Sequence, residues 1–123
     1  MKIRKVSALS TTQLVEKFIE TAITQGDALL VWDTRTYNHL YDKMLDIERE
    51  LKSRPGDQRS VLLSLLSHPN IAVRWKAAVA TLMIAPTAAR EALYSVATAQ
   101  YMPISGHASS TLHYYDNGTF SPT

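Results

Sequence analysis

Apolar residues recur every three or four positions along most of the chain, which is the spacing of amphipathic helices. The first such stretch follows Ser10, which has the capping-box spacing with Gln13, so that each side chain can bond the other's backbone N–H. Gly26 offers a stop, because glycine is common just after helix ends. The apolar face of this first helix comprises Leu14, Val15, Phe18, Ile19, Ala22 and Ile23.

The second helical pattern extends to about Ser53, and either Asp27 or Thr34 is an arguable first residue. Its apolar side comprises Tyr37, Leu40, Tyr41, Met44, Leu45 and Leu51. Charged residues fill the positions between them, and the pairs Glu48 with Lys52 and Glu50 with Arg54 have the acid-first, four-residue spacing of stabilising helix-surface pairs. This charge run therefore predicts a solvated face.

Four shorter helices are expected in the rest of the chain. Asp57 and Asn70 are suited to cap the third and fourth of the six helices, because their side chains accept hydrogen bonds from free backbone N–H groups. Pro86 fits the first turn of the fifth helix. Pro103 precedes the sixth, which Asn117-Gly118 closes. The pattern thus predicts an all-α chain of about six helices in three antiparallel pairs.

One segment, LLSLLSHPNIAVRWKAAVATL, resembles a HEAT repeat. A leucine-rich helix leads through a Pro/Asn turn into a helix marked by Val73 and Arg74, with Ala77 and Ala78 following. In such a repeat the valine and alanines form the packing seam, while the arginine covers apolar surface and bonds a carboxylate or carbonyls of the adjoining repeat. The resemblance implies a short right-handed α-α superhelix.

Most of the chain also resembles a family of small bacterial HEAT or armadillo-like proteins of unassigned function. The resembling segments are YNHLYDKM, RPGDQRSVLLSLLSHPNIAVRWKAA, APTAAREAL and the closing DNG. A length of 123 residues with 46% hydrophobic residues predicts a single domain over residues 1–123, with an N-terminal arm at 1–8 and a flexible tail at 119–123. The departures of the first and last helix pairs from a full repeat suit caps of the stack.

The amino-acid composition excludes several kinds of functional site and predicts a cellular location. The chain has no cysteine, which excludes disulfides, thiolate zinc sites and thiol nucleophiles and fits a cytoplasmic protein. No signal peptide and no apolar run long enough to span a membrane are present, so we expect no membrane association. Residues 1–60 hold 19 of the 24 charged side chains, which leaves the second half of the chain less solvated.

No residue pattern points to catalysis, and we expect no enzyme, cofactor or metal. The four histidines lack the four-residue spacing of a helical metal pair. The nearest approach to an acid/base cluster is Asp33, His39 and Asp42, followed by the pair His113 and Asp116 on the last helix. The spacing of the first group is poor for a shared site, and neither group is accompanied by a phosphate loop or nucleophile motif.

Two apolar groups are candidates for partner binding. Trp75, Val79 and Met83 form a stripe on the fourth helix that points away from the Val73 seam. The stripe either packs on the second or sixth helix or, if exposed, is a binding hot spot on the concave face. A second group, with Tyr114 and Tyr115 on the last helix, either docks a partner or a second copy of the chain, or plugs the open end of the stack. Its other members are Phe120, Tyr94 and Tyr101.

The leading functional hypothesis is a non-enzymatic protein-interaction module, such as an adaptor, an inhibitor or an immunity-type protein, that uses the concave face. The alternative is nucleic-acid binding, but the net charge is only +2 and the cations Arg74, Lys76 and Arg90 are too few to follow a phosphate backbone. Lys2, Arg4 and Lys5 add only a short basic arm. An unrecognised enzyme is the third hypothesis.

Overall fold

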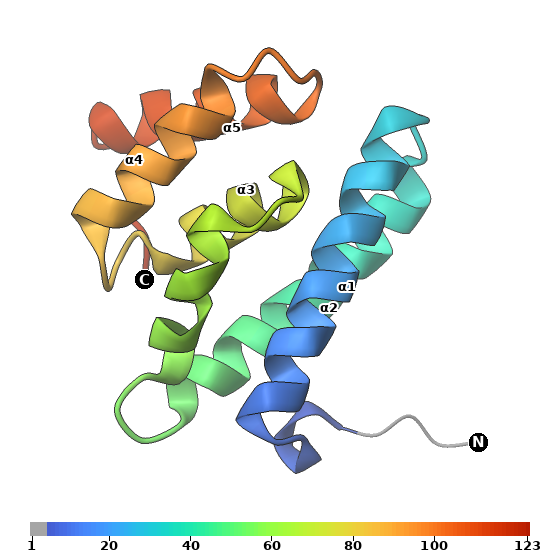
Figure 1. Ribbon diagram of the computed structural model, residues 1–123, viewed down its shortest axis with the longest axis vertical. Coiled ribbons are helices and arrows are strands. Elements are labelled where there is room, and N and C mark those ends of the chain that lie inside the picture. The colour runs from blue at the N-terminus through green and yellow to red at the C-terminus, as the bar shows by residue number, and fades with distance from the viewer. Residues whose placement is uncertain (1–4) are drawn as a thin grey trace.

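The computed structural model describes residues 5–123, which form helices and connecting turns without a strand (Figure 1). The all-α prediction is confirmed, and so are the six helices longer than one turn, which follow a short 3-10 helix. In chain order the elements are η1 (Val6–Ala8), α1 (Thr11–Leu30), α2 (Thr34–Ser53), η2 (Gln58–Ser67), α3 (Ile71–Thr81), α4 (Pro86–Ala97) and α5 (Ile104–Asp116), where η denotes a 3-10 helix.

Most of the predicted helix starts carry the expected caps. Ser10 and Gln13 form the complete capping box, with Gln13 N–H donating to Ser10 Oγ at 3.1 Å and Ser10 N–H donating to Gln13 Oε1 at 2.9 Å. Asn70 Oδ1 accepts from two backbone N–H groups at the start of α3. Pro86 is the first residue of α4. The second helix begins at Thr34, because the Asp33 carboxylate caps it through Thr36 N–H at 3.1 Å.

Gly26 does not end the first helix, which continues to Leu30. The expected stop was wrong because this glycine serves a tertiary contact. A Cβ atom placed on Gly26 would lie 2.7 Å from Ala72 Cβ, so only glycine lets α1 approach α3 this closely. Small residues on both helices therefore set the distance between the first helix pair and the centre of the fold.

We predict that Gly26→Ala destabilises the protein. The new methyl group would force α1 and α3 apart, and such overpacking costs about 1–3 kcal/mol, more than the helix propensity that alanine restores. Gly106→Ala in α5 is the matched control, because its Cβ would meet only the flexible end of Met102 at 2.8 Å. Chemical denaturation should show a lower midpoint for Gly26→Ala and an unchanged or higher one for Gly106→Ala; equal midpoints would contradict the packing argument.

The third helix is a 3-10 helix rather than the expected α-helix. Its buried residues are Arg59, Leu62 and Leu65, which recur every third position. A 3-10 helix has three residues per turn and places such residues on one face, so this repeat suits the tighter geometry. Asp57 caps the element as predicted, accepting from Arg59 N–H at 3.3 Å.

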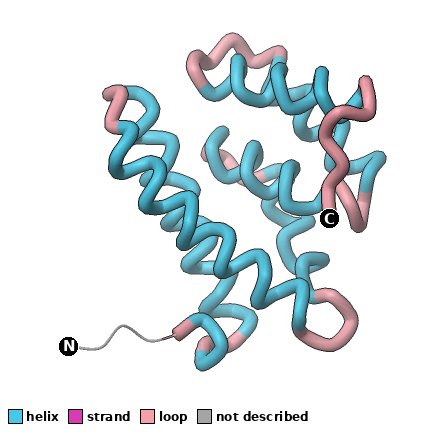
Figure 2. Tube along the Cα trace, turned by 180° about the vertical axis from the view of Figure 1, so that it is seen from behind, coloured by secondary structure: helices cyan, strands magenta, loops and turns pink. Residues whose placement is uncertain are grey.

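Helix α3 is the centre of the molecule and divides the core into two clusters. Its residues Val73, Ala77 and Ala80 pack with α1, α2 and η2, whereas Ala72, Trp75 and Ala78 pack with α4 and α5. Figure 2 shows α1 and α2 side by side as one layer, with α4 and α5 on the other side of α3. This arrangement leaves the flank of α3 that carries Lys76 and Val79 between α2 and α5.

Candidate functional site

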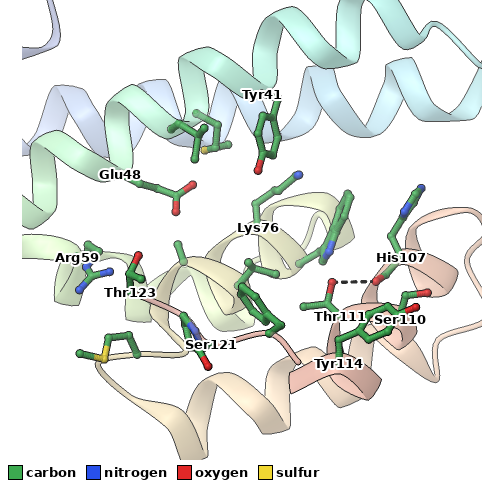
Figure 3. Close-up of a pocket in the computed structure, with 18 of the residues that line it drawn as sticks. Tyr41, Glu48, Arg59, Lys76, His107, Ser110, Thr111, Tyr114, Ser121 and Thr123 are labelled. Atoms are coloured by element: carbon green, nitrogen blue, oxygen red, sulfur yellow. Dashed lines mark hydrogen bonds between the residues drawn. The ribbon is translucent and has the colours of Figure 1, made fainter. Parts of the chain in front are cut away.

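A groove of about 710 Å³ runs between α2, α3 and α5 and is the candidate functional site (Figure 3). Helix α2 forms one wall and α5 the other, while α3 forms the floor and the C-terminal segment 119–123 lies along it. Aromatic and apolar side chains dominate its surface, with a few charged groups among them. The principal lining residues are Tyr37, Tyr41, Met44, Glu48, Arg59, Trp75, Lys76, Val79, Met83, His107, Thr111, Tyr114 and Phe120.

The segment 119–123, predicted to be a flexible tail, runs along this groove and forms part of its lining, with Thr119, Ser121 and Thr123 exposed. Gly118 reverses the chain direction at a φ of +82°, a left-handed conformation that glycine adopts without strain. Phe120 N–H then donates to the Tyr114 carbonyl at 2.9 Å, and the Phe120 side chain packs against the second core cluster. The Lys52 ammonium donates to the carbonyl oxygen of Thr123.

Lys76 is the central charged group of the groove and is only 9% exposed. Its ammonium donates to the Tyr37 hydroxyl at 2.7 Å. It lies 4.1 Å from the ring centroid of Trp75, 4.9 Å from that of Tyr37 and 5.7 Å from that of Tyr41, so three aromatic faces surround it. Burial lowers the pKa of Lys76 to about 8, although the charge of Glu48 acts in the opposite direction. Burial likewise raises the pKa of Tyr37 to about 12, with a further contribution from Tyr41.

Glu48 faces the same groove, which corrects the prediction that it lies on a solvated face. Burial raises its pKa to about 7, against the opposing charges of Lys76, Arg59 and Arg49. No hydrogen bond or ion pair joins its carboxyl group to another residue of the described range 5–123. Glu50, by contrast, pairs with Arg54 at 2.9 Å as predicted. Only the second of the two expected pairs therefore forms, and it is partly buried.

Arg59 supplies the remaining buried cation of the groove wall, but its charge is already matched. Its guanidinium donates to both carboxylate oxygens of Asp57, at 2.9 and 2.7 Å. These bonds hold the pKa of Asp57 below its usual range. Lys76 is thus the buried cation in the groove without a carboxylate bonded to it.

Four of the five predicted partner-binding residues line the groove: Trp75, Val79, Met83 and Tyr114. Trp75 is only 4% exposed and stacks on His107 of α5, with ring centroids 5.7 Å apart, as the packed alternative expected. Met83 and Tyr114 are 54% and 49% exposed. Tyr115 does not line the groove and packs against the second core cluster. Trp75 is consequently part of the groove's floor and not an exposed contact.

The family of the chain follows from comparison with known proteins. The family model described as "Domain of unknown function (DUF2019)" matches residues 12–116, which includes every α-helix except the first residue of α1. The chain belongs to the DUF2019 family. The protein RPA1889 from Rhodopseudomonas palustris CGA009 has a similar crystal structure, with 40% sequence identity and a TM-score of 0.91 over 99% of this chain and 100% of that one. No protein with a curated function matches significantly.

The HEAT-like residues of this DUF2019 chain occupy structural positions. Val73 and Ala77 belong to the first core cluster and Ala78 to the second. Arg74 donates to the carbonyls of His68 at 2.7 Å and Pro69 at 3.0 Å. The arginine therefore bonds carbonyls, as expected, but those of the turn before its own helix rather than of an adjoining repeat.

The groups considered for catalysis do not converge. Asp33 caps α2 and bonds Thr36, which lowers the pKa of its carboxyl group. Neither His39 nor Asp42 lines the groove. Asp116 forms an ion pair with Arg90 at 2.6 Å, and His113 lies edge-on to Tyr114. Within residues 5–123 no group of three or more His, Asp or Glu side chains is placed to hold a metal ion.

The cations considered for nucleic-acid binding are also engaged within the chain. Arg74 is bound to turn carbonyls, Arg90 to Asp116 and Lys76 to Tyr37. Of the predicted basic arm, Lys2 and Arg4 lie outside the described residues. In the described part of the chain no helix is long and apolar enough to cross a bilayer.

A second hollow, of about 690 Å³, lies over α1 and α2. Its charged residues are all exposed and carry both signs: Lys5, Lys17, Glu20, Lys43 and Asp46. It lacks the buried charge and the aromatic walls of the α2–α3–α5 groove, which remains the candidate site.

Sequence reasoning missed Glu48, His107 and the role of Lys76. Glu48 was assigned to water because its spacing from Lys52 suits a surface pair. The overlooked signal was Tyr37, Tyr41, Met44 and Glu48, which follow at intervals of three or four and share one face of α2. A charged residue that continues an apolar face in this way is a candidate for burial.

Proposed function

We propose that this protein is a non-enzymatic protein-interaction module that binds an extended segment of a partner protein in the α2–α3–α5 groove. The observation that carries the proposal is the position of residues 119–123, which have no regular secondary structure and run along the groove as part of its lining. A groove lined by one short extended segment offers apolar walls and polar edges of the kind that another such segment can contact. The chain's own tail is thus a stand-in for the partner.

The expected partner segment carries an aromatic side chain in the place of Phe120. Phe120 is the tail residue that packs against the core cluster containing Trp75 and Leu112. An aromatic anchor in a preformed pocket supplies much of the binding energy at interfaces of this kind. The exposed Met83 and Tyr114 at the rim are suited to contact the rest of the segment.

The arrangement of the helices supports a HEAT-like stack as the scaffold for this groove. Consecutive elements pack on one another, α1 on α2, η2 on α3 and α4 on α5, and α3 lies at the centre. In short solenoids of this type the inner helices present a concave binding surface. Because the chain lacks cysteine and its similar structure comes from a bacterium, we infer that the protein acts in the cytoplasm of a bacterial cell.

The test uses a peptide with the sequence of residues 117–123 and the full chain carrying Phe120→Ala. This substitution removes the anchor of the chain's own tail, so the labelled peptide should bind in trans. The wild-type chain should bind it at least about tenfold more weakly, because a tethered tail competes at an effective concentration in the millimolar range. Fluorescence polarisation measures both affinities.

Two controls make the result specific. A peptide with alanine at position 120 should bind the Phe120→Ala chain about tenfold more weakly than the native peptide, since it lacks the aromatic anchor. Circular dichroism must show that the variant remains helical. A folded Phe120→Ala chain that binds neither peptide would refute the proposed function.

A further inference from the structure

The groove contains a buried positive charge, the Lys76 ammonium, which forms no ion pair with a carboxylate of the described residues. The Lys76 ammonium has three N–H donors, and one of them bonds the Tyr37 hydroxyl. The three ion pairs of the described residues involve Arg54, Arg59 and Arg90, so Lys76 has no carboxylate within ion-pair distance among them. A buried ammonium normally requires an opposite charge at contact distance.

Glu48, the acidic residue that also lines the groove, does not fully compensate the positive charge of Lys76. Glu48 and Lys76 influence each other electrostatically, but they form no ion pair. With a pKa of about 7, the Glu48 carboxyl group is substantially protonated at neutral pH, when it attracts the ammonium only weakly. A carboxylate brought into contact with Lys76 would therefore gain more than Glu48 already provides.

We propose that Lys76 recognises a carboxylate in the partner segment, so that the groove selects an acidic extended peptide with an aromatic anchor. The inference rests on the proposed function and specifies the chemistry of its partner. Lys76 lines the same groove as Phe120, which places the carboxylate-binding group within the surface that receives the segment. Figure 3 shows Lys76 reaching into the groove, with Glu48 towards one end and His107 towards the other.

The surroundings of Lys76 favour a carboxylate at this position. The faces of Tyr37, Tyr41 and Trp75 hold the ammonium in place, so little side-chain entropy remains to be lost on binding. These rings also exclude water from the ammonium, which strengthens its attraction to an incoming anion. The hydroxyl group of Ser110 lines the α5 wall and provides a further donor, whereas the neighbouring Thr111 hydroxyl donates to the His107 carbonyl at 3.1 Å.

The experiment compares peptides based on residues 117–123 in which glutamate replaces Thr119, Ser121 or Thr123, one at a time. Each glutamate peptide has a matched glutamine peptide of the same size. With the full Phe120→Ala chain, we expect at least one glutamate peptide to bind about tenfold more tightly than its glutamine counterpart. Adding Lys76→Met to that chain should abolish the difference, whereas adding Lys43→Met, an exposed lysine outside the groove, should preserve it.

The outcomes separate the two proposals. If the native peptide binds but no glutamate peptide surpasses its glutamine partner, or if the advantage survives Lys76→Met, carboxylate recognition by Lys76 is wrong and peptide binding stands. If no peptide binds, the proposed function itself fails. Lys76→Gln serves as a second variant that retains a hydrogen-bond donor without the charge, and it should likewise lose the glutamate preference.

Discussion

Trp75→Ala should lower the free energy of unfolding by about 3–5 kcal/mol, the usual cost of truncating a buried tryptophan. The side chain is only 4% exposed, belongs to the second core cluster and stacks on His107. Its loss would leave a cavity between α3 and α5 and remove one of the aromatic faces around Lys76. Urea denaturation followed by circular dichroism at 222 nm measures the change.

Trp32 is the matched control, because it is the other tryptophan and is 82% exposed. It lies in the α1–α2 turn with a φ of 59°, a left-handed conformation that a bulky side chain rarely adopts. Trp32→Ala should change the free energy of unfolding by less than about 0.5 kcal/mol. Comparable losses for both variants would contradict the assignment of Trp75 to the core.

The burial of Trp75 also governs how partner binding should be tested. A Trp75→Ala chain that fails to bind could have lost either its fold or its binding surface. Met83 and Tyr114 are better targets, since both line the groove and are about half exposed. Substitutions at these two positions remove contact surface with little effect on the core.

The sequence predicted the local features of the fold well, because they depend on neighbouring residues. The Ser10 capping box, the Asn70 cap and the Pro86 first turn all involve groups within a few residues of one another. The same is true of the Val73, Ala77 and Ala80 seam, which follows from helical spacing.

Features that depend on contacts between residues far apart in the sequence could not be predicted from local patterns. Gly26 was interpreted as a helix end because its contact with Ala72 lies outside local reasoning. The positions of Phe120 and of the Glu48 carboxyl group likewise depend on how α2, α3 and the C-terminal segment pack against one another. The candidate site consists mainly of such contacts. The sequence therefore identified Trp75, Val79, Met83 and Tyr114 as binding candidates, but not the roles of Lys76 and Glu48.

The buried charges should give the protein an unusual dependence of stability on pH. Glu48 has a pKa of about 7 in the folded protein against an ordinary 4.5, so the folded state binds more protons and stability falls as pH rises from about 4.5 to 7. Lys76 has a pKa of about 8 against 10.5, so the unfolded state binds more protons and stability rises above pH 8. Together they predict a minimum between about pH 7 and 8.

Lys76→Met tests this expectation directly. Methionine fills the space between the aromatic rings without a charge, and replacing a poorly compensated buried ion by an apolar group of similar size stabilises proteins by about 1–4 kcal/mol. We therefore expect a higher free energy of unfolding at pH 7.5 and no rise between pH 8 and 9.5, measured by urea denaturation across pH 5–9.5. Lys43→Met, at an exposed position, should leave the profile unchanged.

A stabilised Lys76→Met chain that also loses its preference for glutamate peptides would show that Lys76 serves binding at the expense of stability. The other groups facing Lys76 and Glu48 in the groove change little over this pH range: Arg59 is paired with Asp57, and the pKa of Tyr37 is raised to about 12. His107 also lines the groove, so a His107→Gln chain measured in the same way is a further control. A Lys76→Met chain less stable than wild type at pH 7.5 would instead assign the ammonium a structural role, through Tyr37 and the aromatic rings.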